Sequence, residues 1–65
     1  MPIYPETKVR LTGHDGNAFM ILGKVREALR RDGVGAAEIE KFSSEATAGD
    51  YDHLLQTCGR WVVIS

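Results

Sequence analysis

The fold is decided by a strand, a turn and a helix within the stretch TKVRLTGHDGNAFMILGKVREALRR, residues 7–31. Residues 7–12 alternate apolar and polar side chains, with Val9 and Leu11 on one face of an extended chain. This period of two predicts a half-buried strand. The glycines and Asx residues of the sequence GHDGN, residues 13–17, favour a turn directly after that strand.

An amphipathic helix is predicted over residues 18–31, after the turn. Its apolar residues recur at helical spacing along one face: Ala18, Ile21, Leu22, Val25, Ala28 and Leu29. Asp15 or Asn17 can cap the start of the helix by accepting a hydrogen bond from a free backbone amide. Gly33 can take the left-handed position of a Schellman motif, with Val34 packing back on the last turn.

Two further helices and a closing strand complete the pattern. A helix over residues 36–48 carries a thin apolar stripe: Ile39, Phe42 and Ala46. Asp50 is the expected N-cap of a third helix, which Gly59 is expected to end. The third helix places four residues on one face: Tyr51, Leu54, Leu55 and Cys58. Residues 61–64, with the sequence WVVI, are typical of a closing strand.

The order β-α-α-α-β predicts a small α+β domain over residues 7–65, preceded by a tail of residues 1–6. We expect a two-stranded sheet with the helices on one of its faces. Both prolines of the chain lie in the tail, where Ile3 and Tyr4 could still dock onto the domain. A sheet of two strands leaves its edges open, and pairing with a second copy would cover one of them.

Length and composition limit the class of protein. A chain of 65 residues is one domain near the lower size limit for independent folding, so self-association would help its small core. Cys58 is the single cysteine, which excludes a disulfide within the chain and fits a reducing compartment. No signal peptide and no membrane-spanning stretch is apparent. We therefore expect a cytoplasmic protein without a membrane segment.

No motif in the chain predicts a catalytic, metal or cofactor site. The turn lies where phosphate-binding loops occur, but it lacks their glycine spacing, and we interpret it as a helix cap. His14, Asp15 and His53 lack the spacing of metal ligands, so surface histidines are the expectation. Cys58 lies on an apolar stripe and is expected to be a small buried residue. An enzyme that uses these histidines is the least favoured of three hypotheses.

Phe19 and Met20 are the least expected residues of the first helix, because they project away from its apolar stripe. Gly23 lies near them and permits close approach of another backbone. An exposed patch of this kind would mark a contact surface for a protein partner or a second copy. The alternative is that Ile3 and Tyr4, or Trp61, cover the patch within the same chain. The two interpretations have equal weight.

Positive charge is concentrated in the first half of the chain. Residues 1–31 hold six Lys or Arg against three acids, whereas residues 32–65 hold two against six. Five basic residues on the first strand and helix could grip nucleic-acid phosphates: Lys8, Arg10, Arg26, Arg30 and Arg31. The net charge of −1 and the lack of a reader motif favour a solvated face instead.

Four segments of the sequence resemble a group of short, uncharacterised bacterial and phage proteins. They are GHDGNAF (13–19), ILGKV (21–25), EATAGDYDHLL (45–55) and WVV (61–63). The resemblance implies a cytosolic protein of bacterial or mobile-element origin and implies no activity. The leading hypothesis is a non-enzymatic, self-associating protein-interaction module that uses Phe19, Met20 and Gly23. The alternative is a nucleic-acid-binding accessory protein.

Overall fold

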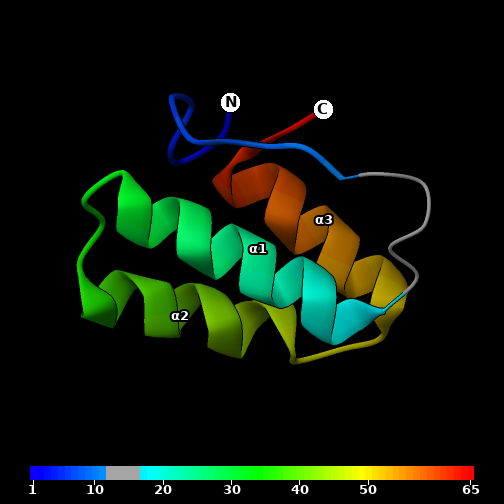
Figure 1. The fold of residues 1–65 in the computed structure, drawn as a ribbon. Coiled ribbons are helices and arrows are strands. Elements are labelled where there is room, and N and C mark those ends of the chain that lie inside the picture. Colours follow the sequence, from blue (N-terminus) through cyan, green and yellow to red (C-terminus); the bar gives the residue numbers. More distant parts are fainter. Residues whose placement is uncertain (12–16) are drawn as a thin grey trace.

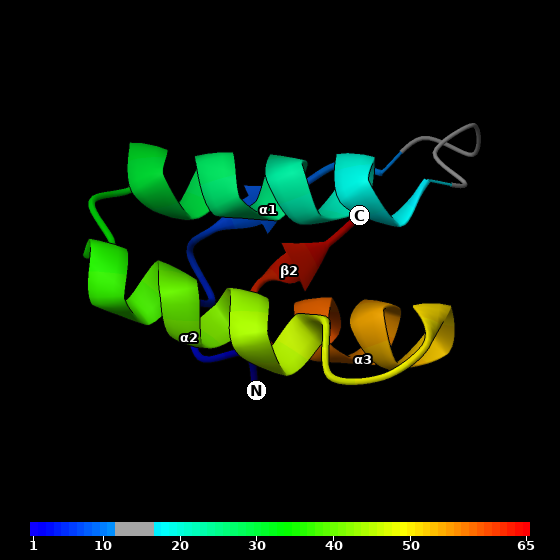
Figure 2. The same ribbon diagram turned by 90° about the horizontal axis from the view of Figure 1, so that it is seen from below.

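The computed structural model of the chain describes residues 1–11 and 17–65. Its elements follow the predicted order β-α-α-α-β: β1 (Lys8–Val9), α1 (Ala18–Arg31), α2 (Ala36–Ala46), α3 (Tyr51–Trp61) and β2 (Val63–Ile64). The helices lie together on one side of the two strands, with α2 farthest from them (Figures 1 and 2). The predicted α+β class, the order of elements and the one-sided layering are confirmed.

The two strands are parallel, a direction that the sequence left open. Lys8 pairs with Val63 and Val9 pairs with Ile64. Parallel neighbours need a long crossover connection, and here the three helices provide it. The paired part of the two strands is shorter than predicted, since only two residues of each strand are paired. Residue 12, the predicted end of the first strand, lies outside the described residues.

The core lies between the sheet and the apolar stripes of the three helices. Its most completely buried side chains come from all three helices and from the residue before β2: Ile21, Val25, Leu29, Phe42, Thr57, Cys58, Trp61 and Val62. Val9 is buried beneath the sheet, and Leu11 packs at the edge of the same cluster, as predicted. Burial of this apolar surface is the main favourable term in folding.

Side-chain caps fix where two of the helices begin. Asn17 accepts a hydrogen bond from the backbone N–H of Phe19 at 2.9 Å, which satisfies one free amide of α1. Asp50 does the same for α3 by accepting from the N–H of His53 at 2.9 Å. Both caps were predicted from the sequence, and the other candidate for α1, Asp15, lies outside the described residues.

The end of α1 is the predicted Schellman motif. Gly33 has a φ of 87°, the left-handed conformation in which a side chain would be strained. Its N–H donates to the carbonyl of Arg30 and the N–H of Val34 donates to the carbonyl of Leu29, each at 3.0 Å. Val34 packs against the core, as the motif requires. This turn directs the chain back along α1 as α2.

Helix α3 does not end at Gly59, as the sequence suggested, but continues to Trp61. Trp61 lies three residues after Cys58 and seven after Leu54, so a helix places all three on its buried face. Burying a tryptophan outweighs the cost of about 1 kcal/mol for a glycine inside a helix. The predicted strand over residues 61–64 is reduced to Val63–Ile64. Helix α2 likewise ends at residue 46 rather than 48.

Trp61 joins the N-terminal segment to the helices. Its ring stacks on Tyr4 with the ring centroids 5.8 Å apart, and it forms a T-shaped pair with Phe42 with the centroids 5.6 Å apart. The backbone N–H groups of Ile3 and Tyr4 donate to the carbonyls of Arg60 and Trp61 at 2.9 and 2.8 Å. These bonds satisfy carbonyls that the end of α3 would otherwise leave unpaired. Ile3 and Tyr4 therefore dock onto the domain.

We expect Tyr4→Ala to lower the free energy of unfolding by roughly 1–3 kcal/mol, because it removes an aromatic pair and uncovers Trp61. Ile3→Ala is the matched control, since it keeps the neighbouring backbone bond and changes a side chain that is 57% exposed. Its effect should stay within about 0.5 kcal/mol. Urea unfolding followed by tryptophan fluorescence measures both, and equal losses would contradict the role given to Tyr4.

Candidate functional site

The large apolar side chains at the start of α1 are exposed. The side chain of Phe19 is 82% exposed and that of Met20 is 52% exposed. The residues named as candidates to cover them are engaged elsewhere, because Tyr4 stacks on Trp61 and the backbone N–H of Ile3 donates to the carbonyl of Arg60. Of the two interpretations left open by the sequence, the structure therefore excludes cover by Ile3, Tyr4 or Trp61.

Gly23 lies one turn after Phe19 and Met20, on the outer face of α1. A Cβ atom placed on Gly23 would meet no atom within 4 Å. The glycine is thus not required by packing within the described part of the chain. Packing among the described residues therefore gives no reason for a residue that costs about 1 kcal/mol relative to alanine in a helix.

A small apolar hollow lies beside Phe19, where the start of α1 meets the loop between α2 and α3. It has a volume of about 130 Å³, and the residues that line it include Phe19, Leu22, Ala46, Tyr51 and Leu54. Tyr51, predicted to belong to the buried stripe of the third helix, is 39% exposed. We call Phe19, Met20, Gly23 and Tyr51, together with this hollow, the Phe19 surface.

The five basic residues predicted as a nucleic-acid face do not form one surface. Lys8, Arg10 and Arg31 line a hollow of about 250 Å³ between β1 and α1, and Lys24 joins them there. Glu27 is the acid among the residues lining it. Lys24 was not among the five basic residues predicted to bind nucleic acid, although its spacing of seven residues from Arg31 places the two on one helix face. We call this hollow the basic groove.

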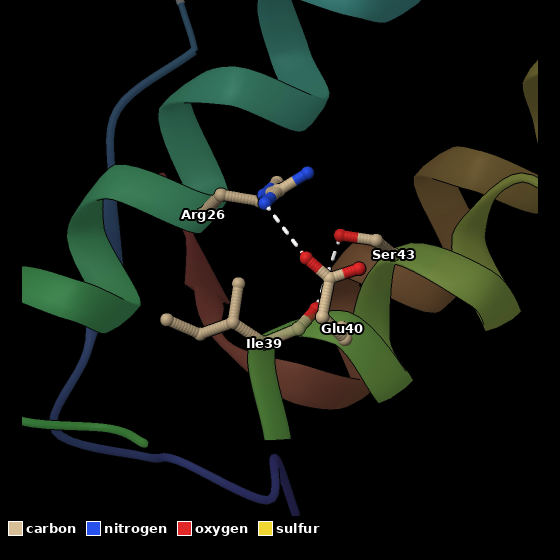
Figure 3. Close-up of polar contacts among 4 residues, drawn as sticks. All are labelled: Arg26, Ile39, Glu40 and Ser43. Carbon is tan, nitrogen blue, oxygen red and sulfur yellow. Dashed lines mark hydrogen bonds and ion pairs between the residues drawn. The ribbon is translucent and has the colours of Figure 1, made fainter. Parts of the chain in front are cut away.

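Arg26 and Arg30 belong to the opposite flank of α1, facing α2. Arg26 donates to Glu40 of α2 across 3.1 Å (Figure 3). Both side chains of this ion pair remain largely in water, so it contributes about 0–1 kcal/mol to stability. The predicted basic face is therefore divided, and its second half is partly neutralised by an acid on the neighbouring helix.

His53 has a structural position. Its Nε2 donates to the carbonyl of Glu45 at 2.7 Å, which ties the start of α3 to the end of α2. A Cβ atom on Gly49 would lie 2.9 Å from His53, so the loop packs directly on this side chain. Thr57, one turn later, is buried and donates its hydroxyl to the carbonyl of His53 at 2.8 Å. His14 and Asp15 lie outside the described residues.

Cys58 is completely buried within the core, as predicted. Burial raises the pKa of its thiol from an ordinary value of 9.0 to about 11, and a backbone hydrogen bond opposes part of this shift. Nucleophilic cysteines have the opposite property, a lowered pKa at a partly exposed site. The environment of Cys58 therefore favours a packing role.

The raised pKa makes the stability of the fold depend on pH in the alkaline range. Below about pH 9 the thiol is protonated in the folded and unfolded chains alike, so it has no effect. Above this value the unfolded chain loses the proton first, and the free energy of unfolding should fall by roughly 2–3 kcal/mol as pH rises through about 11.

Cys58→Ala isolates this effect from the titration of tyrosine and lysine, because it removes the thiol alone. Urea unfolding of both proteins over a series of alkaline pH values should show a steeper loss of stability in the wild type than in Cys58→Ala. Parallel curves would show that the thiol keeps its ordinary pKa in the fold.

Within the described part of the chain, no three His, Cys, Asp or Glu side chains are placed to hold a metal ion. No helix in residues 1–11 and 17–65 has the length and apolar character required to cross a bilayer. No family model, curated protein or solved structure matches the chain. The resemblance to short bacterial and phage proteins thus stays a prediction. The features of the structure that bear on function are the Phe19 surface and the basic groove.

Proposed function

We propose that the protein is a non-enzymatic interaction module that self-associates through the Phe19 surface. The observation that carries the proposal is the exposure of Phe19, whose side chain is 82% accessible beside an apolar hollow. Leaving a phenylalanine in water forgoes about 1.5–3 kcal/mol of burial. In a domain of this size that loss is a substantial fraction of total stability, and association would recover it.

A second copy of the chain is the partner that best fits the hollow. Its volume of about 130 Å³ is close to that of the apolar cavity of about 150 Å³ that accepts benzene in another protein. Phe19 offers an aromatic ring of this size next to the hollow. A two-fold axis would place the Phe19 ring of each copy in the hollow of the other, since such interfaces are reciprocal.

The Phe19 surface is small, so the dimer should be weak. Stable complexes bury about 800 Å² on each partner, more than four residues and a shallow hollow supply. We therefore expect dissociation constants in the micromolar range or above. Gly23 contributes by its lack of a side chain, which lets the facing backbone approach α1.

The other features of the proposal follow from the sequence and the site. Burial of the single thiol fits a protein that works in the reducing cytoplasm without a disulfide. The hydrogen bonds of His53 and the burial of Cys58 are accounted for by structural roles. A bacterial or phage origin, implied by the resemblance, belongs to the same proposal.

The double variant Phe19→Ser/Met20→Gln tests the surface directly. We expect the wild type to pass from monomer to dimer over a concentration series that reaches about 1 mM, because exposed apolar area drives association. The variant should remain monomeric at every concentration. Sedimentation velocity measures the change.

Ile3→Ser is the matched control, because Ile3 is an exposed apolar residue on the N-terminal segment. It should dimerise like the wild type. A wild type that stays monomeric throughout the series, or a double variant that still dimerises, would overturn the proposal.

Gly23→Ala separates the glycine's role in association from its role in the helix. Alanine should stabilise the isolated domain by about 0.8–1 kcal/mol, since a Cβ meets nothing within 4 Å. It should nevertheless weaken the dimer several-fold, because the added methyl group stands between the facing helices.

Gly59→Ala in α3 is the control for this comparison, because Gly59 also has open space around its Cα. It should give a similar gain in stability with no change in the dissociation constant. Thermal unfolding at low concentration and sedimentation at high concentration measure the two quantities. If both variants dimerise equally, Gly23 has no part in the interface.

A further inference from the structure

The basic groove gathers positive charge in a chain whose formal net charge is −1. Lys8 and Arg10 come from β1 and the residue that follows it, and they share a face because alternate residues of an extended chain do so. Lys24 and Arg31 come from α1, where seven residues make almost two full turns. The spacing of these residues in the two elements thus places four basic residues around one hollow. Glu27 also lines the hollow and contributes a negative charge.

The two basic residues that come from β1 and its following residue are available to a ligand. Lys8 and Arg10 are exposed, and neither forms an ion pair within the described residues. Arg31 has an exposed contact with Asp32 at 3.8 Å, a distance and setting in which water and salt weaken the attraction. Within the described residues, the groove therefore keeps a positive surplus at Lys8 and Arg10.

The free edge of β1 adds backbone donors to this surplus. The N–H of Val63 donates to the carbonyl of Thr7, and the N–H of Ser65 donates to that of Val9. Because the backbone groups of successive strand residues point to opposite edges, the N–H of Lys8 points away from β2. Such an N–H at a sheet edge can donate to a phosphate oxygen, and the carbonyl of Lys8 points to the same edge.

We propose that the basic groove binds the phosphate backbone of nucleic acid without reading the bases. The Cα atoms of Lys8 and Arg10 are about 7 Å apart along the extended chain, and those of Lys24 and Arg31 are about 10 Å apart along the helix, from the rise of each element. This spacing suits a chain of repeating phosphates better than one compact anion. Among the described residues, no aromatic side chain lines the groove, so these residues offer no platform for base stacking and the contact is independent of sequence.

The test compares two double variants of equal formal charge. Lys8→Gln/Arg10→Gln removes two cations of the groove, and Arg26→Gln/Arg30→Gln removes two from the opposite flank of α1. Fluorescence anisotropy with a short labelled DNA duplex, and with one of its strands alone, reports binding at about 50 mM salt. The wild-type affinity should fall with salt, and each groove cation removed should cost about tenfold at this salt concentration.

The groove variant should also flatten the dependence of log affinity on log salt by nearly two units for duplex, while the flank variant keeps the wild-type slope. Inorganic pyrophosphate should compete only weakly, since it occupies part of the groove. No binding at low salt, equal weakening by both variants, or a marked preference for one base sequence would overturn the proposal.

Glu27 provides a test by gain of affinity. Glu27→Gln removes the acid from the groove and should tighten duplex binding several-fold, because it no longer repels phosphate. Glu40→Gln makes the same change in charge on α2, where Glu40 faces Arg26, and should leave binding unchanged. Equal gains in the two variants would show that net charge alone controls binding, which would contradict a defined groove.

Discussion

The packing of Trp61 is the interaction on which the rest of the domain depends. Its indole is 2% exposed and lies between Tyr4 of the N-terminal segment and Phe42 of α2. It is also the last residue of α3, and only Val62 separates it from β2. One side chain thus joins elements that lie far apart in the sequence. In a domain of 65 residues, the free energy gained by burial and the chain entropy lost on folding nearly cancel. The packing of Trp61 is therefore needed to hold the sheet against the helices.

The same packing explains why the start of α1 is uncovered. The N-terminal segment, which could have shielded Phe19, is held at the other end of the molecule by the stack of Tyr4 on Trp61 and by its bonds to the end of α3. Phe19 and Met20 therefore face water next to an apolar hollow. The outer part of the sheet is also exposed. There Lys8 and Arg10 place charges along an open strand edge, and these charges oppose pairing with other strands. The described surface thus has an exposed apolar part around Phe19 and an exposed positive part around Lys8 and Arg10.

The elements that depend on local chemistry could be predicted from the sequence. Asn17, Asp50 and Gly33 act through hydrogen bonds and backbone conformation within a few residues, and their roles were predicted correctly. The prediction that Trp61 belongs to a strand was wrong. It followed the β propensity of tryptophan, whereas the spacing of three residues from Cys58 is helical. The parallel direction of the strands and the division of the basic residues depend on contacts between distant segments, which no local pattern contains. The exposure of Phe19 was left open for the same reason, since it depends on where Tyr4 docks.

The concentration dependence of the amide chemical shifts of the wild-type protein tests this division of the surface most directly. If the Phe19 surface joins two copies, a dilution series should move the resonances of residues 18–23 and of Tyr51, while those of Tyr4, Trp61 and the basic groove stay fixed. Shifts confined to β1 and β2 would instead indicate that copies pair through the open sheet edges. Shifts that do not change with concentration would contradict the central role given to Phe19.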